Sequence, residues 1–576
     1  MPDDFRVQPP RHTPAEQLSN AWDALGDHLI SLKGLWPHRS DYRELPRTWR
    51  GDLVAGLTVG IVALPLALGF GVASGAGAAA GMVTAIVAGV VAAVFGGSHL
   101  QVSGPTGAMT VVLLPVIAAY GIQHIPLLAI MAGILVVLMG MTALGRAVDL
   151  IPLPVVEGFT FGIGVIILLQ QLPLVLGAPK GESESSLVAA WETIVAADWT
   201  AALAPLAITA LVVVLHLVGE RLARGVPISL IAIVVATIVV ELSGLDVARI
   251  GALPSTLPAP SLPTFDLRTI QALAAPALAV AALAALESLL SARVADGMVP
   301  RVTKTNPDRE LVGQGLANIA AGLFGGIPAT GAIARTAVLA RTGGRTRLAS
   351  VFHAVVLLGV MLAAGPIVAL IPMAALGGVL VMVAVRMVNV RKARTLMATT
   401  RADRTTLVLT FLATVILDLV MAVMLGFAMA AVTSLRHMAS YTVVRRQELP
   451  ADTRQGLVDL PANAEHLRPH IALYRVDGAL FYGDARRFVE AVESVEDAVR
   501  VVIIRCHRMS VFDASGAEAL HDVVRALGRR GIDVVVQGMT AAQVRTAQLM
   551  DAAPPDRFVR GLPEAITLAT GLAEPQ

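Results

Sequence analysis

The chain has 576 residues, of which 55% are hydrophobic and only 15% are charged, and its mean hydropathy is +0.72. A soluble globular protein carries about 25% charged residues, so this composition predicts that lipid is the solvent for much of the chain. The net charge of +2 gives no support for a nucleic-acid partner, and the single cysteine, Cys506, excludes a disulfide framework and a cysteine-based metal cluster. The twelve histidines lack metal-ligand spacing, so we expect no metal site and no bound cofactor.

Residues 1–50 are polar, with arginine, aspartate and proline throughout, and the first apolar run begins only near Leu53. A secretory signal would instead place an apolar stretch after a short basic start. We therefore expect residues 1–50 to form a cytoplasmic N-terminal arm.

Between residues 51 and 438, apolar runs follow one another with short polar breaks. A bilayer-spanning helix needs about 20 apolar residues. The candidate spans are 53–72, 78–95, 125–145, 151–176, 200–218, 226–243, 270–292, 347–364, 366–386, 404–417 and 419–436. Two runs, 106–120 and 331–340, are too short to cross alone, and a Gly/Ala-rich run at 311–324 could be a thin span packed against other helices. The pattern predicts a polytopic α-helical transport domain with about fourteen segments.

Charge predicts the orientation of this domain. Arginine and lysine gather before the first span and in the loops around 293–309, 341–347 and 386–404, whereas the loop 177–199 is mainly acidic. Cytoplasmic loops carry an excess of basic residues, so we expect a multi-pass inner-membrane protein with both termini in the cytoplasm.

The character of the sequence changes after the last span. Residues 439–468 are polar and are expected to be a linker, and residues 469–576 have the pattern of a small α/β domain. The expected strands and helices are Ile471–Val476, Val501–Ile504 and Val534–Val536, and Ala485–Val495 and Ala517–Leu527. A piece of this length is large enough to fold on its own.

An internal repeat marks the two short runs. Phe-Gly-Gly at 95–97 is followed by Pro-Thr-Gly-Ala at 105–108, and Phe-Gly-Gly at 324–326 is followed by Pro-Ala-Thr-Gly-Ala at 328–332. Each copy opens one short run. Paired Gly/Pro-interrupted segments in two halves of a membrane protein are typical of a transporter's binding site.

The physical reason is electrostatic. A helix that begins inside the membrane has backbone N–H groups without partners and a partial positive charge, so two facing helix starts form an anion site. Thr106 and Thr330 can each add a hydroxyl, and Gly107 and Gly331 allow close approach to the backbone. The alternative is that each Pro-Thr-Gly merely breaks a helix, but two matched copies favour a site. The predicted substrate-binding residues of the repeat are Thr106, Gly107, Ala108, Ala329, Thr330, Gly331 and Ala332.

Three polar residues are candidates for ion coupling. Glu287 lies deep in an apolar span, where an ionisable group is costly and usually functional. Burial disfavours its charged form, so Glu287 is a candidate proton carrier; the alternative is a structural carboxylate paired with Arg335. Ser291, one turn further on, could face the same cavity. Arg335, one turn into the second half-helix, could attract the anion or neutralise Glu287.

Read with their flanks, these motifs resemble the SulP (solute carrier 26) anion transporters over nearly the whole chain. The matching motifs are Gly-Asp-Leu-Val-Ala-Gly-Leu-Thr at 51–58, Leu-Pro at 64–65, Ser-Gly-Pro-Thr-Gly at 103–107, Pro154-Val155, Gly158-Phe159, Asn318, Gly-Leu-Phe-Gly-Gly at 322–326 and Arg335-Thr336. Phe-Asp-Ala-Ser-Gly at 512–516 makes the C-terminal piece similar to a STAS domain.

The resemblance implies a 7+7 inverted repeat, with a core domain of segments 1–4 and 8–11 that moves against a gate domain of segments 5–7 and 12–14. It places the substrate between the starts of segments 3 and 10 and implies a homodimer with cytoplasmic STAS domains.

The first span resembles the bicarbonate-transporting branch, because Leu66 follows Leu-Pro and is followed by a stretch that ends at Phe70-Gly71. This resemblance adds Leu66 and Phe70 to the expected substrate site. The same branch resembles a sodium-coupled design with an aspartate where this chain has Glu287, and it lacks an arginine at the position of Arg335. Coupling to H⁺ or to Na⁺ therefore both stay open.

We expect a secondary transporter of a small inorganic anion such as sulfate or bicarbonate. The alternatives are a C4-dicarboxylate/proton symporter, a channel-like anion pathway, and a non-transporting receptor whose output is the STAS domain. The sequence shows no nucleophile–base pair and no phosphate loop, so we do not expect an enzyme.

Overall fold

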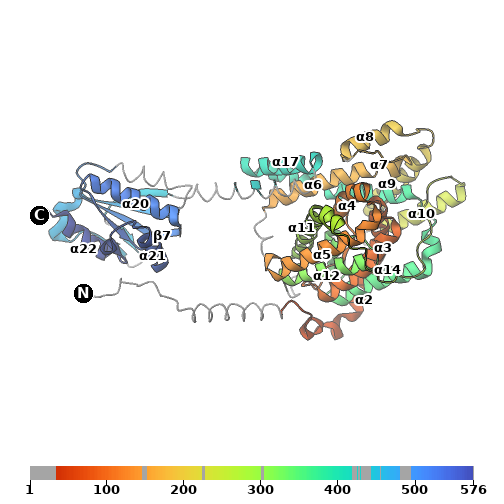
Figure 1. The fold of residues 1–576 in the computed structure, drawn as a ribbon, viewed down its shortest axis with the longest axis horizontal. Coiled ribbons are helices and arrows are strands. Elements are labelled where there is room, and N and C mark those ends of the chain that lie inside the picture. The colour runs from red at the N-terminus through yellow and green to blue at the C-terminus, as the bar shows by residue number, and fades with distance from the viewer. Residues whose placement is uncertain are drawn as a thin grey trace. The chain divides into compact units, whose positions relative to one another are not determined.

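The computed structural model describes residues 34–145, 152–183, 185–222, 227–299, 304–417, 443–449, 451–453, 456–480 and 495–574, with a few residues between 425 and 432. Two compact units divide the chain, one within Thr13–Ala428 and the other containing Met429–Gln576. The first is helical and the second is built on a sheet (Figure 1).

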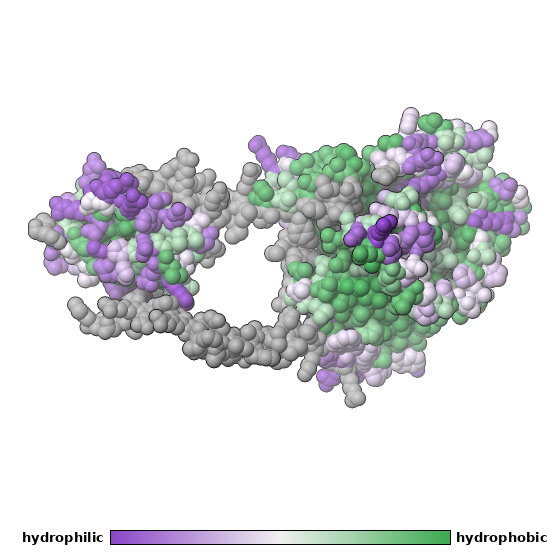
Figure 2. Space-filling view, viewed as in Figure 1, coloured by the Kyte–Doolittle hydropathy of each residue, from purple (hydrophilic) through white to green (hydrophobic). Residues whose placement is uncertain are grey.

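The helical unit follows the predicted spans closely. Its helices are α2 Leu45–Ala73, α3 Ala78–Phe95, α4 Gly107–Tyr120, α5 Ile125–Met141, α6 Leu153–Gln170, α7 Leu172–Leu176, α8 Ser186–Ala196, α9 Leu203–Leu222, α10 Ile228–Ser243, α11 Leu267–Met298, α12 Pro307–Leu323, α13 Ile333–Arg341, α14 Arg347–Val368, α15 Met373–Met387, α16 Val390–Met397 and α17 Arg401–Ile416. Within the described residues, seven helical stretches are long and apolar enough to cross a membrane. The surface agrees with a membrane environment, because apolar residues cover a broad zone of this unit (Figure 2).

The two short runs form the short helices α4 and α13, with 14 and 9 residues. Two further helices, α8 and α16, lie in segments where no span was predicted; α8 occupies the acidic loop and α16 a basic one. The predicted span 419–436 lies almost entirely outside the described residues.

Small residues let the spans pack closely. A Cβ on Gly133 of α5 would lie 2.6 Å from the carbonyl oxygen of Gly315 in α12, and a Cβ on Gly56 of α2 would lie 2.5 Å from that of Ala349 in α14. Such contacts between backbones are typical of membrane helices, where packing rather than hydrophobic burial drives association. They bind helices from the two halves of the sequence together, α5 to α12 and α2 to α14.

The C-terminal unit is a five-stranded mixed sheet in the order β3-β6-β7-β8-β9. Its elements are β3 Val443–Gln447, β6 Ile471–Leu480, β7 Val501–Phe512, α20 Ala514–Arg529, β8 Asp533–Gln537, α21 Ala541–Leu549, β9 Phe558–Val559 and α22 Leu562–Ala573, and a separate hairpin of β4 Ala451–Thr453 and β5 Gly456–Val458. Strands β6, β7, β8 and β9 run parallel to one another, and β3 joins antiparallel at the edge opposite β9. Buried apolar clusters lie on both faces, as parallel strands require.

The sheet begins earlier in the chain than the sequence indicated. β3 lies inside residues 439–468, the expected linker, and its Val443 is opposite Asp477 of β6. The strand is short and carries two adjacent arginines, so its pattern does not stand out from a polar connection. The predicted helix 485–495 lies outside the described residues apart from Val495.

Candidate anion-binding site

A two-stranded β-ladder joins the two copies of the repeat. β1 (Ser103–Gly104) pairs antiparallel with β2 (Thr330–Gly331), with Ser103 opposite Gly331 and Gly104 opposite Thr330. α4 begins three residues after β1 and α13 begins two residues after β2. The ladder therefore brings together two helix starts that are more than two hundred residues apart in the sequence.

The first helix start carries ionisable partners. The Thr106 hydroxyl donates to Oε2 of Glu287 at 2.9 Å, and Nη2 of Arg335 donates to the carbonyl of Pro105 at 2.6 Å. Glu287 comes from α11 and Arg335 from α13, so side chains of two other helices hold consecutive residues of one loop. Among the described contacts, Glu287 and Arg335 form no ion pair with each other, and Nε and Nη1 of Arg335 are buried without a hydrogen-bond acceptor.

The second helix start is held by neutral groups. The Thr330 hydroxyl lies 2.9 Å from the Ser288 hydroxyl and donates to the carbonyl of Ala284 at 3.2 Å. The Gly331 N–H donates to the same Ser288 oxygen at 3.0 Å. The side-chain amide of Asn318 donates to the carbonyl of Ala329 and accepts from its N–H. Thr330 is fully buried and its hydroxyl is bound, so it faces the scaffold.

The helix starts themselves keep free donors. The first two N–H groups of α4, at Gly107 and Ala108, and those of α13, at Ile333 and Ala334, have no hydrogen-bond acceptor among the described residues. Neither helix has a side-chain cap. Gly107 and Ala108 are buried, where N–H groups without partners are costly, whereas Ile333 and Ala334 are exposed and therefore accessible. Both helix starts can therefore receive an acceptor from outside the chain.

The remaining predicted residues divide into near and distant ones. Phe70 lies beside the first start, because a Cβ added at Gly107 would lie 3.2 Å from its Cε1. Leu66 is buried one turn earlier in the same helix. Ser291 is fully buried and donates to Thr336 at 3.1 Å, so it supports the start of α13 from behind rather than facing Glu287.

Two neighbours of the site were missed by the sequence analysis. Ser288, next to Glu287, binds both Thr330 and Gly331; its signal was a second polar residue in the same apolar span. Ile167 of α6 lies against the start of α4, because a Cβ at Gly107 would be 2.2 Å from its Cδ1. An isoleucine in an apolar helix gives no such signal.

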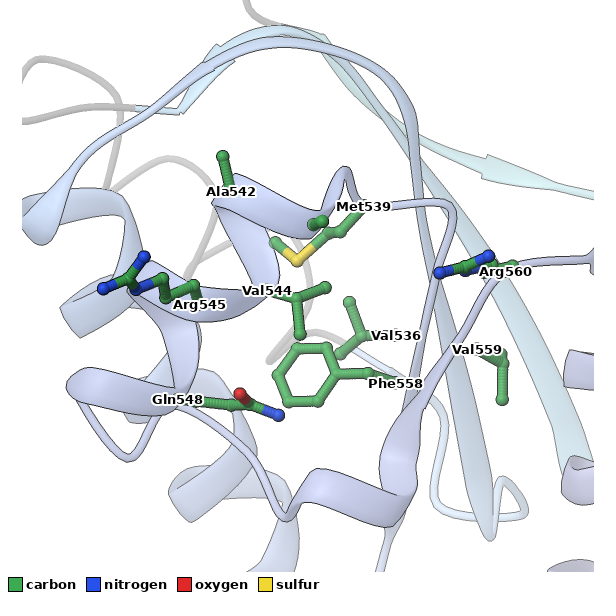
Figure 3. Close-up of a pocket in the computed structure, with 10 residues that line it drawn as sticks. Val536, Met539, Ala542, Val544, Arg545, Gln548, Phe558, Val559 and Arg560 are labelled. Atoms are coloured by element: carbon green, nitrogen blue, oxygen red, sulfur yellow. The ribbon is translucent and has the colours of Figure 1, made fainter. Parts of the chain in front are cut away.

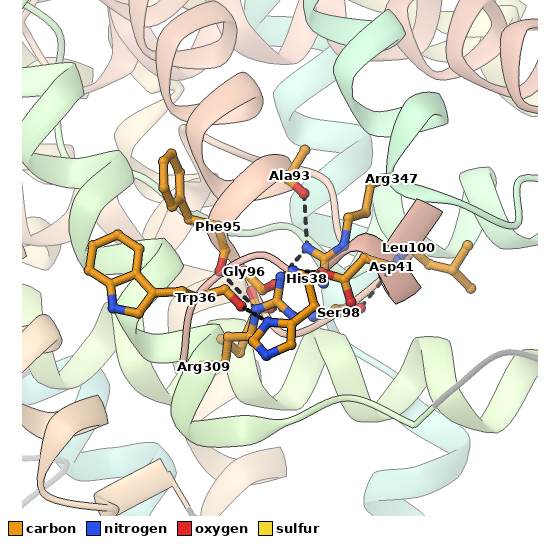
Figure 4. A network of polar contacts seen from close by, with 11 residues as sticks. Trp36, His38, Asp41, Ala93, Phe95, Gly96, Ser98, Leu100, Arg309 and Arg347 are labelled. Atoms are coloured by element: carbon orange, nitrogen blue, oxygen red, sulfur yellow. Dashed lines mark hydrogen bonds and ion pairs between the residues drawn. The ribbon is translucent and has the colours of Figure 1, made fainter. Parts of the chain in front are cut away.

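The loop leading to β1 is fixed by side chains from distant helices (Figure 4). Arg347 of α14 donates to the carbonyls of Ala93 at 3.0 Å and Gly96 at 2.6 Å. Arg309 of α12 donates to Asp41, ahead of α2, at 2.6 Å. The arm residue Asp41 thus belongs to the network that sets the position of the first helix start.

The C-terminal unit has a cavity of about 280 Å³ between α21 and the strands β8 and β9 (Figure 3). Phe558 and Val544 point into it, and Arg545 and Arg560 lie at its sides. None of the predicted site residues lies there.

Comparison with known proteins gives the same assignment for both units. Residues 49–410 match the sulfate permease family and residues 464–559 match the STAS domain. The bicarbonate transporter BicA of Synechocystis is 31% identical over 514 residues, covering 87% of this chain and 90% of BicA. Rv1739c of Mycobacterium tuberculosis, named "Probable sulfate transporter", is 29% identical over 565 residues, covering 93% and 98%.

The fold agrees as well. The solved structure of SLC26A9 superposes with a TM-score of 0.79 at 16% identity and covers 96% of this chain and 95% of that one. The chain therefore belongs to the sulfate permease (SulP, solute carrier 26) family of multi-pass membrane anion transporters, which are not enzymes, and it carries a C-terminal STAS domain.

Proposed function

We propose that this chain is a proton-coupled symporter of a small inorganic oxyanion, sulfate or bicarbonate, which binds between the starts of α4 and α13. The observation that carries the proposal is the pair of adjacent, uncapped helix starts with free N–H groups at Gly107, Ala108, Ile333 and Ala334. Two helix starts supply donors and positive potential that match an oxyanion and need no bound cation.

Glu287 links the anion to a proton. Its carboxyl accepts a hydrogen bond from Thr106, the residue immediately before α4, so a charged Glu287 lies beside the anion's position. Two like charges about 4 Å apart repel by about 4 kcal/mol at an effective dielectric of 20. Protonation removes this repulsion and leaves the positive charge of Arg335, so proton and anion bind together.

The same proposal includes the segment arrangement of the family: fourteen segments in a 7+7 repeat, a core domain that carries α4 and α13, and a gate domain that carries α6. Ile167 of α6 would then be the gate side chain that closes over Gly107. The dimer and the cytoplasmic position of both termini and of the STAS domain follow as further parts of the proposal.

Uptake by proteoliposomes tests the coupling. We expect labelled sulfate or bicarbonate to accumulate when an inward proton gradient is imposed, without sodium. Glu287→Gln should retain counterflow exchange but lose accumulation driven by the pH gradient. Glu241→Gln is the matched control, since Glu241 forms a surface ion pair with Arg249.

The second candidate is sodium coupling, favoured by the resemblance of the first span to the bicarbonate-transporting branch together with the carboxyl of Glu287 beside Thr106. Accumulation that requires sodium and is indifferent to the proton gradient would replace the proton assignment. Uptake of a C4-dicarboxylate in preference to both inorganic anions would replace the substrate class.

A further inference from the structure

A cavity of about 440 Å³ lies where the first span begins, away from the anion site. It is lined by Glu44, Arg47, Thr48, Gly51, Gly343 and Arg345. Arg47 lies in the first turn of α2, and Arg345 lies in the loop between α13 and α14. Two separate elements therefore bring two arginine residues to one opening.

Asp52 builds this cavity. Its side chain is fully buried in α2 and accepts hydrogen bonds from the N–H groups of Arg345 at 2.7 Å and Thr346 at 3.1 Å. The hydroxyls of Thr346 and Thr48 also donate to it, at 2.6 and 2.8 Å. Four hydrogen bonds to one buried carboxylate fix the loop against α2, so the backbone at Arg345 is held next to the first turn of α2 before any ligand arrives.

The arginines are available to a ligand. Among the residues that the structure describes, neither guanidinium has a hydrogen bond or an ion pair. Two arginines at one cavity match a phosphate group, which accepts several charge-assisted hydrogen bonds. The Glu44 carboxylate lines the same cavity and repels an anion, but it accepts hydrogen bonds from hydroxyl groups of a larger headgroup.

The surroundings point to a lipid as the source of the phosphate. Trp49 is 44% exposed, and the guanidinium of Arg50 lies 5.3 Å from the centre of its ring. Val54 and Leu57, on the next turns of α2, are 61% and 46% exposed. A basic and aromatic turn followed by exposed apolar residues is typical of the boundary between lipid headgroups and acyl chains. Basic pockets at this level bind anionic headgroups.

We propose that the cavity between the start of α2 and the α13–α14 loop is a binding site for one anionic phospholipid, whose phosphate binds Arg47 and Arg345 and whose headgroup hydroxyls reach Glu44. The charge pattern places this site in the cytoplasmic leaflet. Phosphatidylglycerol has the required chemistry, a phosphodiester with free hydroxyls. Because this loop directly follows the C-terminal end of α13, a bound lipid would also stabilise the position of α13.

Native mass spectrometry of the full-length protein tests this site. The protein is reconstituted in phosphatidylcholine with added phosphatidylglycerol, and lipids that survive release from the membrane are counted. We expect wild type to retain phosphatidylglycerol, and the double variant Arg47→Gln/Arg345→Gln to retain it about tenfold less. The double variant Arg391→Gln/Arg394→Gln is the charge-matched control, because both arginines lie in α16 within another basic loop, and it should retain lipid as wild type does.

Three outcomes would overturn the proposal. Equal retention by the double variant and wild type would show that the lipid binds elsewhere. Displacement of the lipid by inorganic phosphate at comparable concentration would identify a free phosphate site instead. The double variant Arg47→Lys/Arg345→Lys keeps the charge of both side chains but not the planar fork of donors, so it should recover only part of the retention. Full recovery would show a general surface-charge effect instead.

Discussion

The two helix starts of the repeat have similar sequences but are held in different ways. Around the first, Thr106 binds the carboxylate of Glu287 and the Pro105 carbonyl binds Arg335. Around the second, Thr330 and Gly331 bind the neutral hydroxyl of Ser288. The first copy is therefore tied to two ionisable groups, of which Glu287 can change its charge, and the second is tied to a neutral hydroxyl.

This difference assigns unequal roles to the copies. A rigid, neutral second start gives the anion a fixed set of donors. The first start can respond to protonation, because the hydrogen bond that Thr106 donates weakens when Glu287 becomes neutral. The repeat places two similar helix starts at the site. Glu287 of α11 and Arg335 of α13 make the two starts electrostatically different, which proton coupling requires.

Adding a methyl group at Gly331, before the second helix start, should have the largest effect on uptake and stability. A Cβ at Gly331 would lie 1.9 Å from Nε2 of Gln101 and 3.1 Å from Cα of Ser288, so Gly331→Ala must displace a buried side chain beside a backbone. We expect loss of uptake and a destabilisation of about 3 kcal/mol, measured by thermal unfolding in detergent. Gly107→Ala meets the terminal methyl of Ile167, which can rotate, so it should reduce uptake with a smaller loss of stability. Equal losses of stability would contradict the difference between the copies.

The stability that Asp41 gives to the loop before the first helix start should depend on pH. Burial opposes the charge of Asp41, but hydrogen bonds from Arg309 and His38 and the charge of Arg347 outweigh burial and hold the pKa of Asp41 at about 2, below its usual 3.8. Its contribution is therefore present at neutral pH and is lost as pH falls from about 4 to about 2. Asp41→Asn should lower stability by about 2 kcal/mol at pH 7, and the difference from wild type should shrink below pH 3.

Asp41→Glu is the control, since it keeps the charge. It should recover most of the stability at neutral pH. A deficit in Asp41→Asn that does not change with pH would mean that shape, rather than charge, fixes the loop.

Removing the hydroxyl of Thr106 or of Thr330 should have the smallest effects, and these should differ between the two helix starts. Thr330→Val leaves Ser288 and the Ala284 carbonyl short of a partner, so we expect a destabilisation of about 1–2 kcal/mol with an unchanged pH profile of uptake. Thr106→Val should have a smaller effect on stability but should shift the pH profile, because Glu287 loses its hydrogen bond. Thr106→Ser and Thr330→Ser keep the hydroxyl and should restore each property.

The sequence predicted the repeat and its two short helices because the signal is local: a glycine-rich break before an apolar run too short to cross the bilayer. It also singled out Glu287 and Arg335 as candidates, since charge inside an apolar span is conspicuous, and their side chains contact Thr106 and Pro105. It could not predict the β1–β2 ladder, because strands of two residues have no periodicity. The contact of Ile167 with Gly107 and the role of Ser291 behind α13 depend on how helices pack, which a residue's identity does not encode.

The central claim is that free N–H groups from both helix starts, α4 and α13, bind the same anion. A crystal of the full-length protein grown with selenate, with the selenium located by anomalous scattering, tests this most directly. We predict one selenium site within hydrogen-bond reach of the N–H groups of both Gly107 or Ala108 and Ile333 or Ala334. A selenate bound at Arg335 alone, or at only one of the two helix starts, would contradict the claim.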